Sequence, residues 1–93
     1  MAYRLHIECV GKDRWDAENR WHWTERYRFN SLPDTFNRIK QVSESAINHR
    51  VMELWDKWYN VEGMKVIFKE AYRSAEKDGR FYLLITYTVE EIN

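Results

Sequence analysis

The sequence predicts an α+β domain in which a four-stranded antiparallel sheet carries one long helix on one face, in the order ββαββ. Three observations lead to this fold class. Two segments before residue 30 and two after residue 63 alternate apolar and polar residues, which indicates strands with one buried face. Between them, apolar residues recur about every 3.6 positions, which indicates an amphipathic helix. A length of 93 residues suits a single domain spanning 1–93.

The first two strands are expected at residues 2–10 and 20–29, where apolar side chains alternate with Arg, His and Glu. A polar loop joins them into a hairpin. The last two strands are expected at 64–73 and 80–89, with Asp78 and Gly79 as the hairpin dipeptide. The strand at 80–89 is apolar on both faces, so it belongs at the centre of the sheet. We therefore prefer the strand order 3-4-2-1 over 2-1-3-4.

One helix is expected from Ser31 to about Asn60. Ser31 can cap its first turn, Pro33 suits the first helical positions, and Gly63 follows as a stop signal. Its apolar side would consist of Phe36, Ile39, Ser43, Ala46, Ile47, Arg50, Val51, Leu54, Trp58 and Val61.

Three charged residues fall where this pattern requires apolar ones: Glu25, Glu70 and Arg50. A charge inside a core must be paired, because an isolated one costs several kcal/mol. We expect a structural ion network in which Arg50 pairs with Glu25, Glu70 or both. The alternatives are a carboxylate pair used as acid and base, and bulges that shift the register.

The open face of the predicted sheet is rich in cations. The residues expected on it are Arg4, His6, Arg20, His22, Arg26, Arg28, Lys65, Lys69, Arg73, Tyr82 and Leu84. Most balancing acids are expected on the helix, in the loops and in the tail. Such a face can simply be solvated, can bind a protein partner or a second copy through Tyr82 and Leu84, or can bind nucleic acid.

A second candidate surface is a flank of the predicted helix. Met52, Trp55 and Tyr59 lie beside its apolar side, and Trp15 in the first loop can join them. Trp and Tyr are favoured anchors at protein interfaces. The alternative is that these residues pack against the end of the helix or against the loop.

Several function classes lack their sequence signals. The single Cys9 excludes an internal disulfide and suits a reducing, cytoplasmic location. The His residues do not complete a metal site, the isolated Gly residues form no phosphate loop, and no membrane span is apparent. We expect no cofactor, no metal and no enzymatic activity.

The leading expectation is a small non-enzymatic binding protein that engages a protein partner as an inhibitor or adaptor. Small phage-encoded anti-defence inhibitors are similar in size and aromatic content, although this similarity of style maps no residues. The alternative is nucleic-acid or nucleotide binding through the basic sheet face. The sequence also allows a homodimer.

Overall fold

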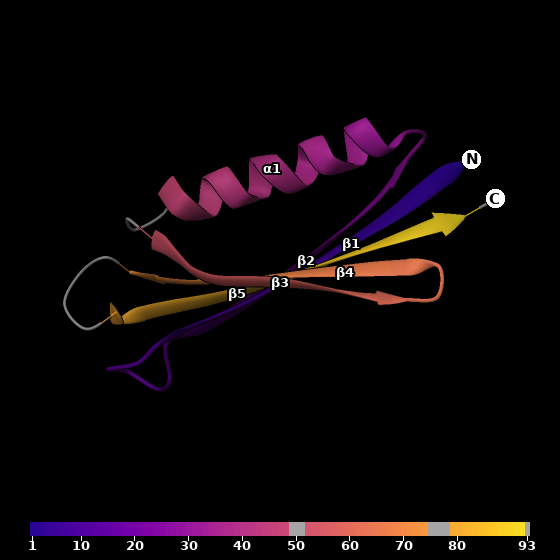
Figure 1. Cartoon of the computed structure of the whole chain (residues 1–93). Helices are drawn as coiled ribbons and strands as arrows, with labels where there is room; N and C mark the ends of the chain where they lie inside the picture. Colours follow the sequence, from indigo (N-terminus) through magenta and orange to yellow (C-terminus); the bar gives the residue numbers. More distant parts are fainter. Residues whose placement is uncertain (49–51, 75–78, 93) are drawn as a thin grey trace.

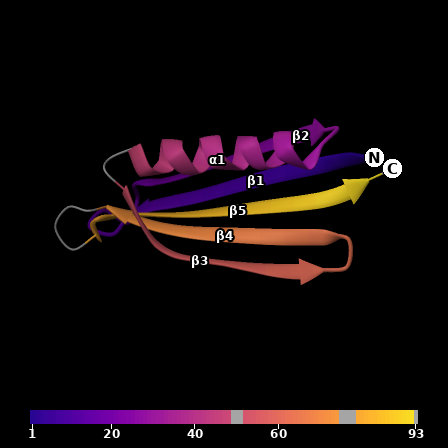
Figure 2. The same ribbon diagram turned by 45° about the horizontal axis from the view of Figure 1, so that its top comes forward.

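The computed structural model of the chain contains one helix and five strands, and it describes residues 1–48, 52–74 and 79–92 (Figure 1). The elements are β1 (Ala2–Asp13), β2 (Arg20–Phe29), α1 (Leu32–Asn48), β3 (Met52–Glu62), β4 (Lys65–Ser74) and β5 (Phe81–Ile92). The strands form one antiparallel sheet in the order β2-β1-β5-β4-β3. The helix lies along one face of this sheet (Figure 2).

The predicted four-stranded sheet and ββαββ order are wrong because the segment predicted as one long helix is two elements. The helix ends at Asn48, and Met52–Glu62 is an edge strand paired with β4. Leu54, Trp58 and Val61, which the helical periodicity placed on the apolar stripe, therefore lie on a strand. Trp, Tyr and Val suit a pleated surface, and a short apolar run fits both periods.

The predicted strand order is also wrong. β5 pairs with β1 and β4, whereas the prediction placed it beside β2. Its expected central position is confirmed. The reason is that β1 buries Leu5, Ile7 and Cys9 fully and gains most from a place inside the sheet, while the heavily charged β2 suits an edge.

The helix begins with a side-chain cap. The Asp34 N–H donates to Ser31 Oγ over 3.3 Å, and the Thr35 N–H donates to the Ser31 carbonyl over 3.2 Å. Thr35, Val42 and Ala46 are its buried residues. Their small or branched side chains let the helix approach the sheet closely.

The core lies between the helix and the three inner strands. Fully buried side chains include Leu5 and Ile7 from β1, Tyr72 from β4, and Ile85 and Tyr87 from β5. They pack with Val42 and Ala46 of the helix.

Gly11 allows an aromatic side chain to lie against the sheet backbone. It pairs with Trp21 across β1 and β2, and a Cβ at position 11 would come within 2.1 Å of the Trp21 ring. Any side chain at position 11 would therefore displace the indole.

Two connections show how the strand ends are held. Gly63, at φ 61°, and Met64 make the tight turn between β3 and β4, so Gly63 ends no helix. At the other end of the sheet, Arg80 donates from Nε and Nη2 to the Asp13 carboxylate over 2.9–3.1 Å. That interaction with Arg80 lowers the pKa of Asp13 to about 2. Asp78, predicted for the last hairpin, lies outside the described residues.

Candidate functional site

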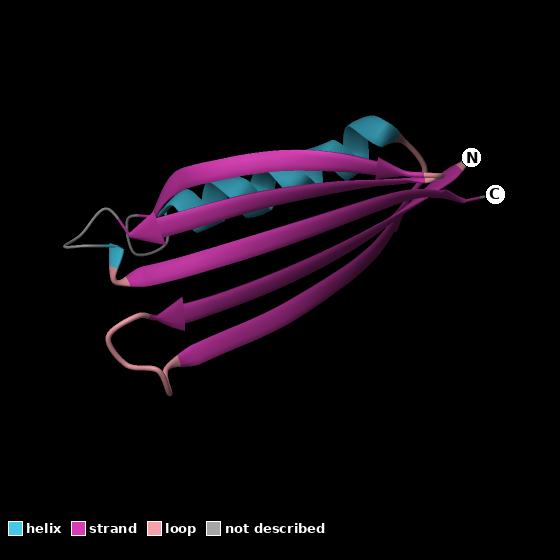
Figure 3. Cartoon of the chain, turned by 60° about the horizontal axis from the view of Figure 1, so that its bottom comes forward, coloured by secondary structure: helices cyan, strands magenta, loops and turns pink. Residues whose placement is uncertain are grey.

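The two faces of the sheet can be assigned from register, because directly paired residues of antiparallel strands point to the same side. The residues in register with Ile7, such as Glu25 and Tyr87, face the helix, and we call this side the covered face. The residues in register with Glu8, such as Thr24 and Thr86, face away from it. This second side is the open face, turned toward the viewer in Figure 3 with the helix behind the strands.

The structure brings together on the open face all the residues predicted for it. They are Arg4, His6, Arg20, His22, Arg26, Arg28, Lys65, Lys69, Arg73, Tyr82 and Leu84. The central strand β5 contributes a mostly uncharged row to the same face: Tyr82, Leu84, Thr86, Thr88 and Glu90.

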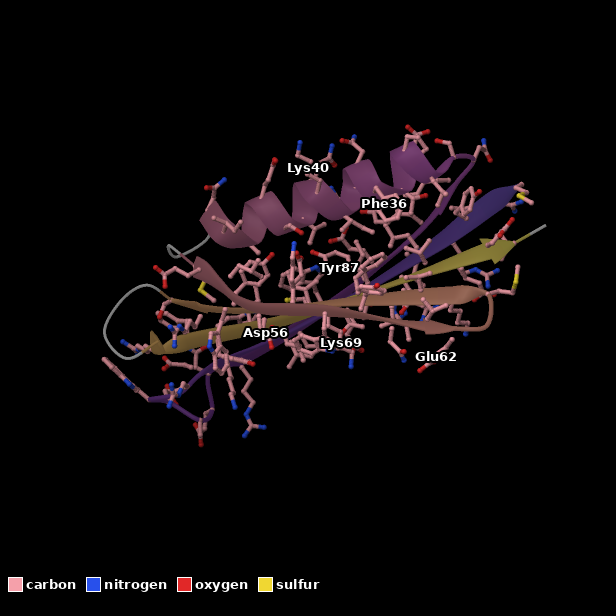
Figure 4. All side chains as sticks on the ribbon, in the orientation of Figure 1. Phe36, Lys40, Asp56, Glu62, Lys69 and Tyr87 are labelled. Atoms are coloured by element: carbon pink, nitrogen blue, oxygen red, sulfur yellow. The ribbon has the colours of Figure 1, made fainter. Side chains whose placement is uncertain are left out.

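The open face also carries acids that sequence reasoning missed. Glu53, Asp56 and Glu62 of β3 pair with Arg73, Ala71 and Lys65 of β4, so they lie on the open face. Figure 4 shows Asp56 and Glu62 on the same side of the sheet as Lys69, opposite to Tyr87. The predicted helix to about Asn60 carried Glu53 and Asp56 away from the sheet, and Glu62 was expected in the loop that follows. The alternation of Glu53 with Leu54 is the signal that a strand interpretation would have used.

Charge is therefore separated across the open face. The edge strand β2 presents Arg20, His22, Arg26 and Arg28, without an acid. The opposite edge strand β3, described in full, presents only acids as charged groups on this face. The sheet is basic at one long edge and acidic at the other.

An aromatic cluster lies near one end of the open face. A register shift between Leu54 and Asp56 places Trp55 on this side. Its ring meets the Tyr82 ring edge-on at 5.8 Å, and the Arg73 guanidinium lies 5.5 Å from its centroid. Lys12 lies 5.7 Å from the Tyr82 centroid. Trp55 is still 56% exposed, so it can be buried by a partner.

A basic depression lies at the other end of the open face. Glu90 is shared by Arg4, at 3.8 Å, and Lys65, at 3.7 Å. These three residues line a depression of about 570 Å³ together with Arg26 and Arg28. His6 lines it too, and its Nε2 has no hydrogen-bond partner in the described part of the chain.

Glu25 is paired on the covered face, but with a different partner from the one predicted. Arg38 Nη2 donates to Glu25 Oε1 over 2.5 Å, Tyr27 donates to the same oxygen, and Trp23 Nε1 donates to Oε2 over 3.1 Å. Burial opposes ionisation, yet these hydrogen bonds outweigh it and lower the pKa of Glu25. Arg50, the predicted partner, lies outside the described residues.

Glu70 belongs to a separate polar cluster under the helix. Ser43 Oγ lies 2.7 Å from Glu70 Oε1, 3.1 Å from the Tyr87 hydroxyl and 3.0 Å from the Ile39 carbonyl. Burial raises the pKa of Tyr87, and burial together with the Glu70 charge raises that of Tyr72. The Tyr72 hydroxyl has no hydrogen-bond partner among the described residues. This arrangement binds helix to sheet.

Two grooves flank the helix on the covered face. One, of about 470 Å³, lies toward β2 and includes Trp23, Glu25 and Arg38. The other, of about 520 Å³, lies toward β3 and is lined mainly by apolar side chains, including Phe36 and Phe68. The rings of these two residues meet edge-on at 5.9 Å.

The predicted helix flank does not exist as one surface. Met52, Trp55 and Tyr59 lie on β3, where Met52 is buried and Trp55 faces the open side. Tyr59 faces the covered side against Phe68 and is 70% exposed. Trp15 lies in the loop after β1, with the Arg80 guanidinium 4.9 Å from its ring. Trp55 therefore lies on the opposite face of the sheet from Tyr59, and Trp15 lies in a loop, so the four residues do not form one surface.

The Cys9 thiol is buried and free. Burial raises the pKa of the Cys9 thiol to about 12, which suppresses its thiolate. No cluster of three or more metal-ligating side chains was found among residues 1–48, 52–74 and 79–92. Over the same ranges, no helix combines the length and apolarity needed to cross a membrane.

Comparison with known proteins does not place the chain in a family. No family matches it, and neither a curated protein nor a solved structure shows significant similarity to it.

Proposed function

We propose that this chain is a non-enzymatic binding protein, of the inhibitor or adaptor kind, which engages a protein partner through the open face of its sheet. The observation that carries the proposal is the composition of that face. It combines exposed aromatic rings, Trp55 and Trp58, with Arg73 and a row of small or apolar residues on β5. Interface centres are enriched in Trp, Tyr and Arg, and their rims are polar.

The surroundings of this centre support a protein as the partner. Basic groups of β2 border it on one side, and on the other side acidic groups of β3 lie beside Trp55 and Trp58. A nucleic acid would gain from the first edge and be repelled by the second. A protein can complement both signs.

The test is affinity capture from source cells with matched double variants. Trp55→Ala with Tyr82→Ala removes the two rings that meet on the open face. Trp15→Ala with Tyr59→Ala removes two exposed rings outside it and serves as the control. We expect the first pair to weaken partner capture by roughly 30-fold or more, the loss of about 2 kcal/mol typical of hot spots, and the control to retain it.

Each sample is divided, and half is treated with nuclease. Capture that survives nuclease and depends on Trp55 and Tyr82 supports the proposal. Loss only in the Trp15–Tyr59 pair would assign binding to another surface.

The basic depression favours a second candidate, nucleic-acid or nucleotide binding. Arg4, Arg26, Arg28 and Lys65 converge there around Glu90, the one acid among the described residues that line the depression. This candidate predicts that Arg26→Glu with Arg28→Glu abolishes binding to single-stranded nucleic acid, and that affinity falls steeply as salt rises. Capture that nuclease abolishes would favour it over a protein partner.

A further inference from the structure

The charge pattern of the open face is complementary to itself about the central strand. The outer strands carry opposite signs, and β5 between them contributes mainly Tyr, Leu and Thr. A surface of this kind matches a second copy if the copy is turned so that each basic edge meets an acidic edge. Only one of the simple face-to-face arrangements does this.

We infer that the open face binds a second copy of this chain, across a two-fold axis that runs parallel to the strands along β5. This rotation places β2 of one copy over β3 of the other and keeps every residue at its own level along the strands. An axis across the strands would instead place β2 over β2 and oppose cations with cations. The inference rests on the proposed function, because it names the protein partner of that same face.

Strand register allows the contacts of this dimer to be worked out level by level. Arg20, Lys12, Tyr82, Arg73 and Glu53 form one level across the sheet, and the rotation brings Arg20 opposite Glu53.

At the other levels the same rotation again places β2 of one copy over β3 of the other, and β1 over β4. The resulting opposed pairs are His22 with Asp56, Arg28 with Glu62, and Glu8 with Lys69, each occurring twice because of the symmetry. The residues on the axis are Tyr82, Leu84, Thr86, Thr88 and Glu90, each meeting its own copy.

At two levels the rotation places like charges opposite each other. In both cases other groups of the same chain already interact with these charges. Lys12 meets Arg73, but these cations lie over the Tyr82 and Trp55 rings of their own copy. Arg4 meets Lys65 at the level where Glu90 of each copy already lies 3.7–3.8 Å from both cations. The two Glu90 carboxylates there are surrounded by cations.

The dimensions fit a stable interface. Five strands about 4.8 Å apart and about ten residues long, at about 3.3 Å each, present roughly 800 Å² per copy, the size of a standard interface. Sheets packed face to face lie about 10 Å apart with strand directions about 30° from parallel, and that twist preserves which edge faces which. The helices remain on the two outer surfaces, where Lys40 points to solvent (Figure 4).

The test is a charge-reversal rescue on the purified chain. Variant A carries Arg20→Glu and Arg28→Glu on β2; variant B carries Glu53→Arg and Glu62→Arg on β3. Sedimentation equilibrium should show a dimer for the wild type that weakens as salt rises. Each variant alone should dimerise roughly 10- to 100-fold more weakly, because its reversed edge meets an edge of the same sign.

Mixing the two variants should restore a dimer that contains one of each, since every edge then meets its opposite. Donor and acceptor fluorophores on A and B report this mixed species. The control reverses the outward pair Lys40 and Glu44 and should leave dimerisation unchanged. Circular dichroism checks folding, and if a double variant fails to fold, Arg28→Glu and Glu62→Arg singly provide the same rescue.

A wild type that stays monomeric at all accessible concentrations would overturn the inference. So would folded variants that dimerise as the wild type does, or a mixture that fails to associate. Such results leave the proposed function standing if Trp55→Ala with Tyr82→Ala still removes a nuclease-resistant partner, and remove both if it does not.

Discussion

The covered and open faces are built from alternate residues of the same strands, but one face is buried against the helix and the other is exposed. The covered face buries Leu5, Ile85 and Tyr87, and its two internal carboxylates, Glu25 and Glu70, have hydrogen-bond donors. The open face leaves aromatic rings partly exposed, and its two edge strands carry charged groups of opposite sign, cations on β2 and acids on β3. Because the two carboxylates of the covered face are hydrogen-bonded within the chain, that face has a structural role. The open face leaves rings and edge charges available to a partner, which is why we propose that it binds one.

The largest expected difference between the two faces is in the unfolding free energy of variants at two adjacent residues of β5. Ile85 is fully buried on the covered face, and Leu84 lies on the open face. Ile85→Ala should cost about 2–5 kcal/mol of unfolding free energy, from lost burial and a residual cavity. Leu84→Ala should cost under about 1 kcal/mol in the monomer.

Urea denaturation at several protein concentrations measures both costs. A Leu84→Ala cost that grows with concentration would show that a second copy buries the open face. Equal costs in a monomer would contradict the assignment of the two faces.

A smaller effect is expected at Gly11, where the Trp21 ring lies against the backbone on the covered face. Gly11→Ala would drive a methyl group into the Trp21 ring and should cost about 1–3 kcal/mol, as overpacking does. The same change in a Trp21→Leu background should cost less, because the obstructing ring is gone. Thermal melts of the four chains give the coupling, and equal costs in both backgrounds would show that the ring moves away freely.

The smallest effect is confined to acid pH, at the sheet end where Asp13 meets Arg80. The folded-state pKa of Asp13 is about 2, below its ordinary 3.8, so the unfolded chain binds its proton more readily. This contribution to stability is therefore present above pH 3.8 and is lost as pH falls toward 2.

Asp13→Asn should flatten the pH dependence of stability in that window, and Asp16→Asn in the same loop is the control. Urea midpoints measured from neutral to acid pH give the comparison. An unchanged slope in Asp13→Asn would contradict the assigned role of the Arg80 pair.

Sequence alternation was sufficient to identify β1, β2, β4 and β5 and to assign their two faces. Alternation is sufficient because successive side chains of a strand point to opposite faces, so neighbouring residues in the sequence show which face is buried. The cations and Tyr82 of the open face followed directly from that alternation, as did the central place of β5.

Tertiary structure alone decided the conformation of residues 52–62, and with it the charge pattern of the open face. The local sequence suits either a helix or a strand, and pairing with β4 selects the strand. That choice moved Glu53, Asp56 and Glu62 to the open face and separated Trp55 from Tyr59. The partner of Glu25 was likewise decided by packing, because Arg38 is 13 positions away in the chain and is brought near only when the helix lies on the sheet.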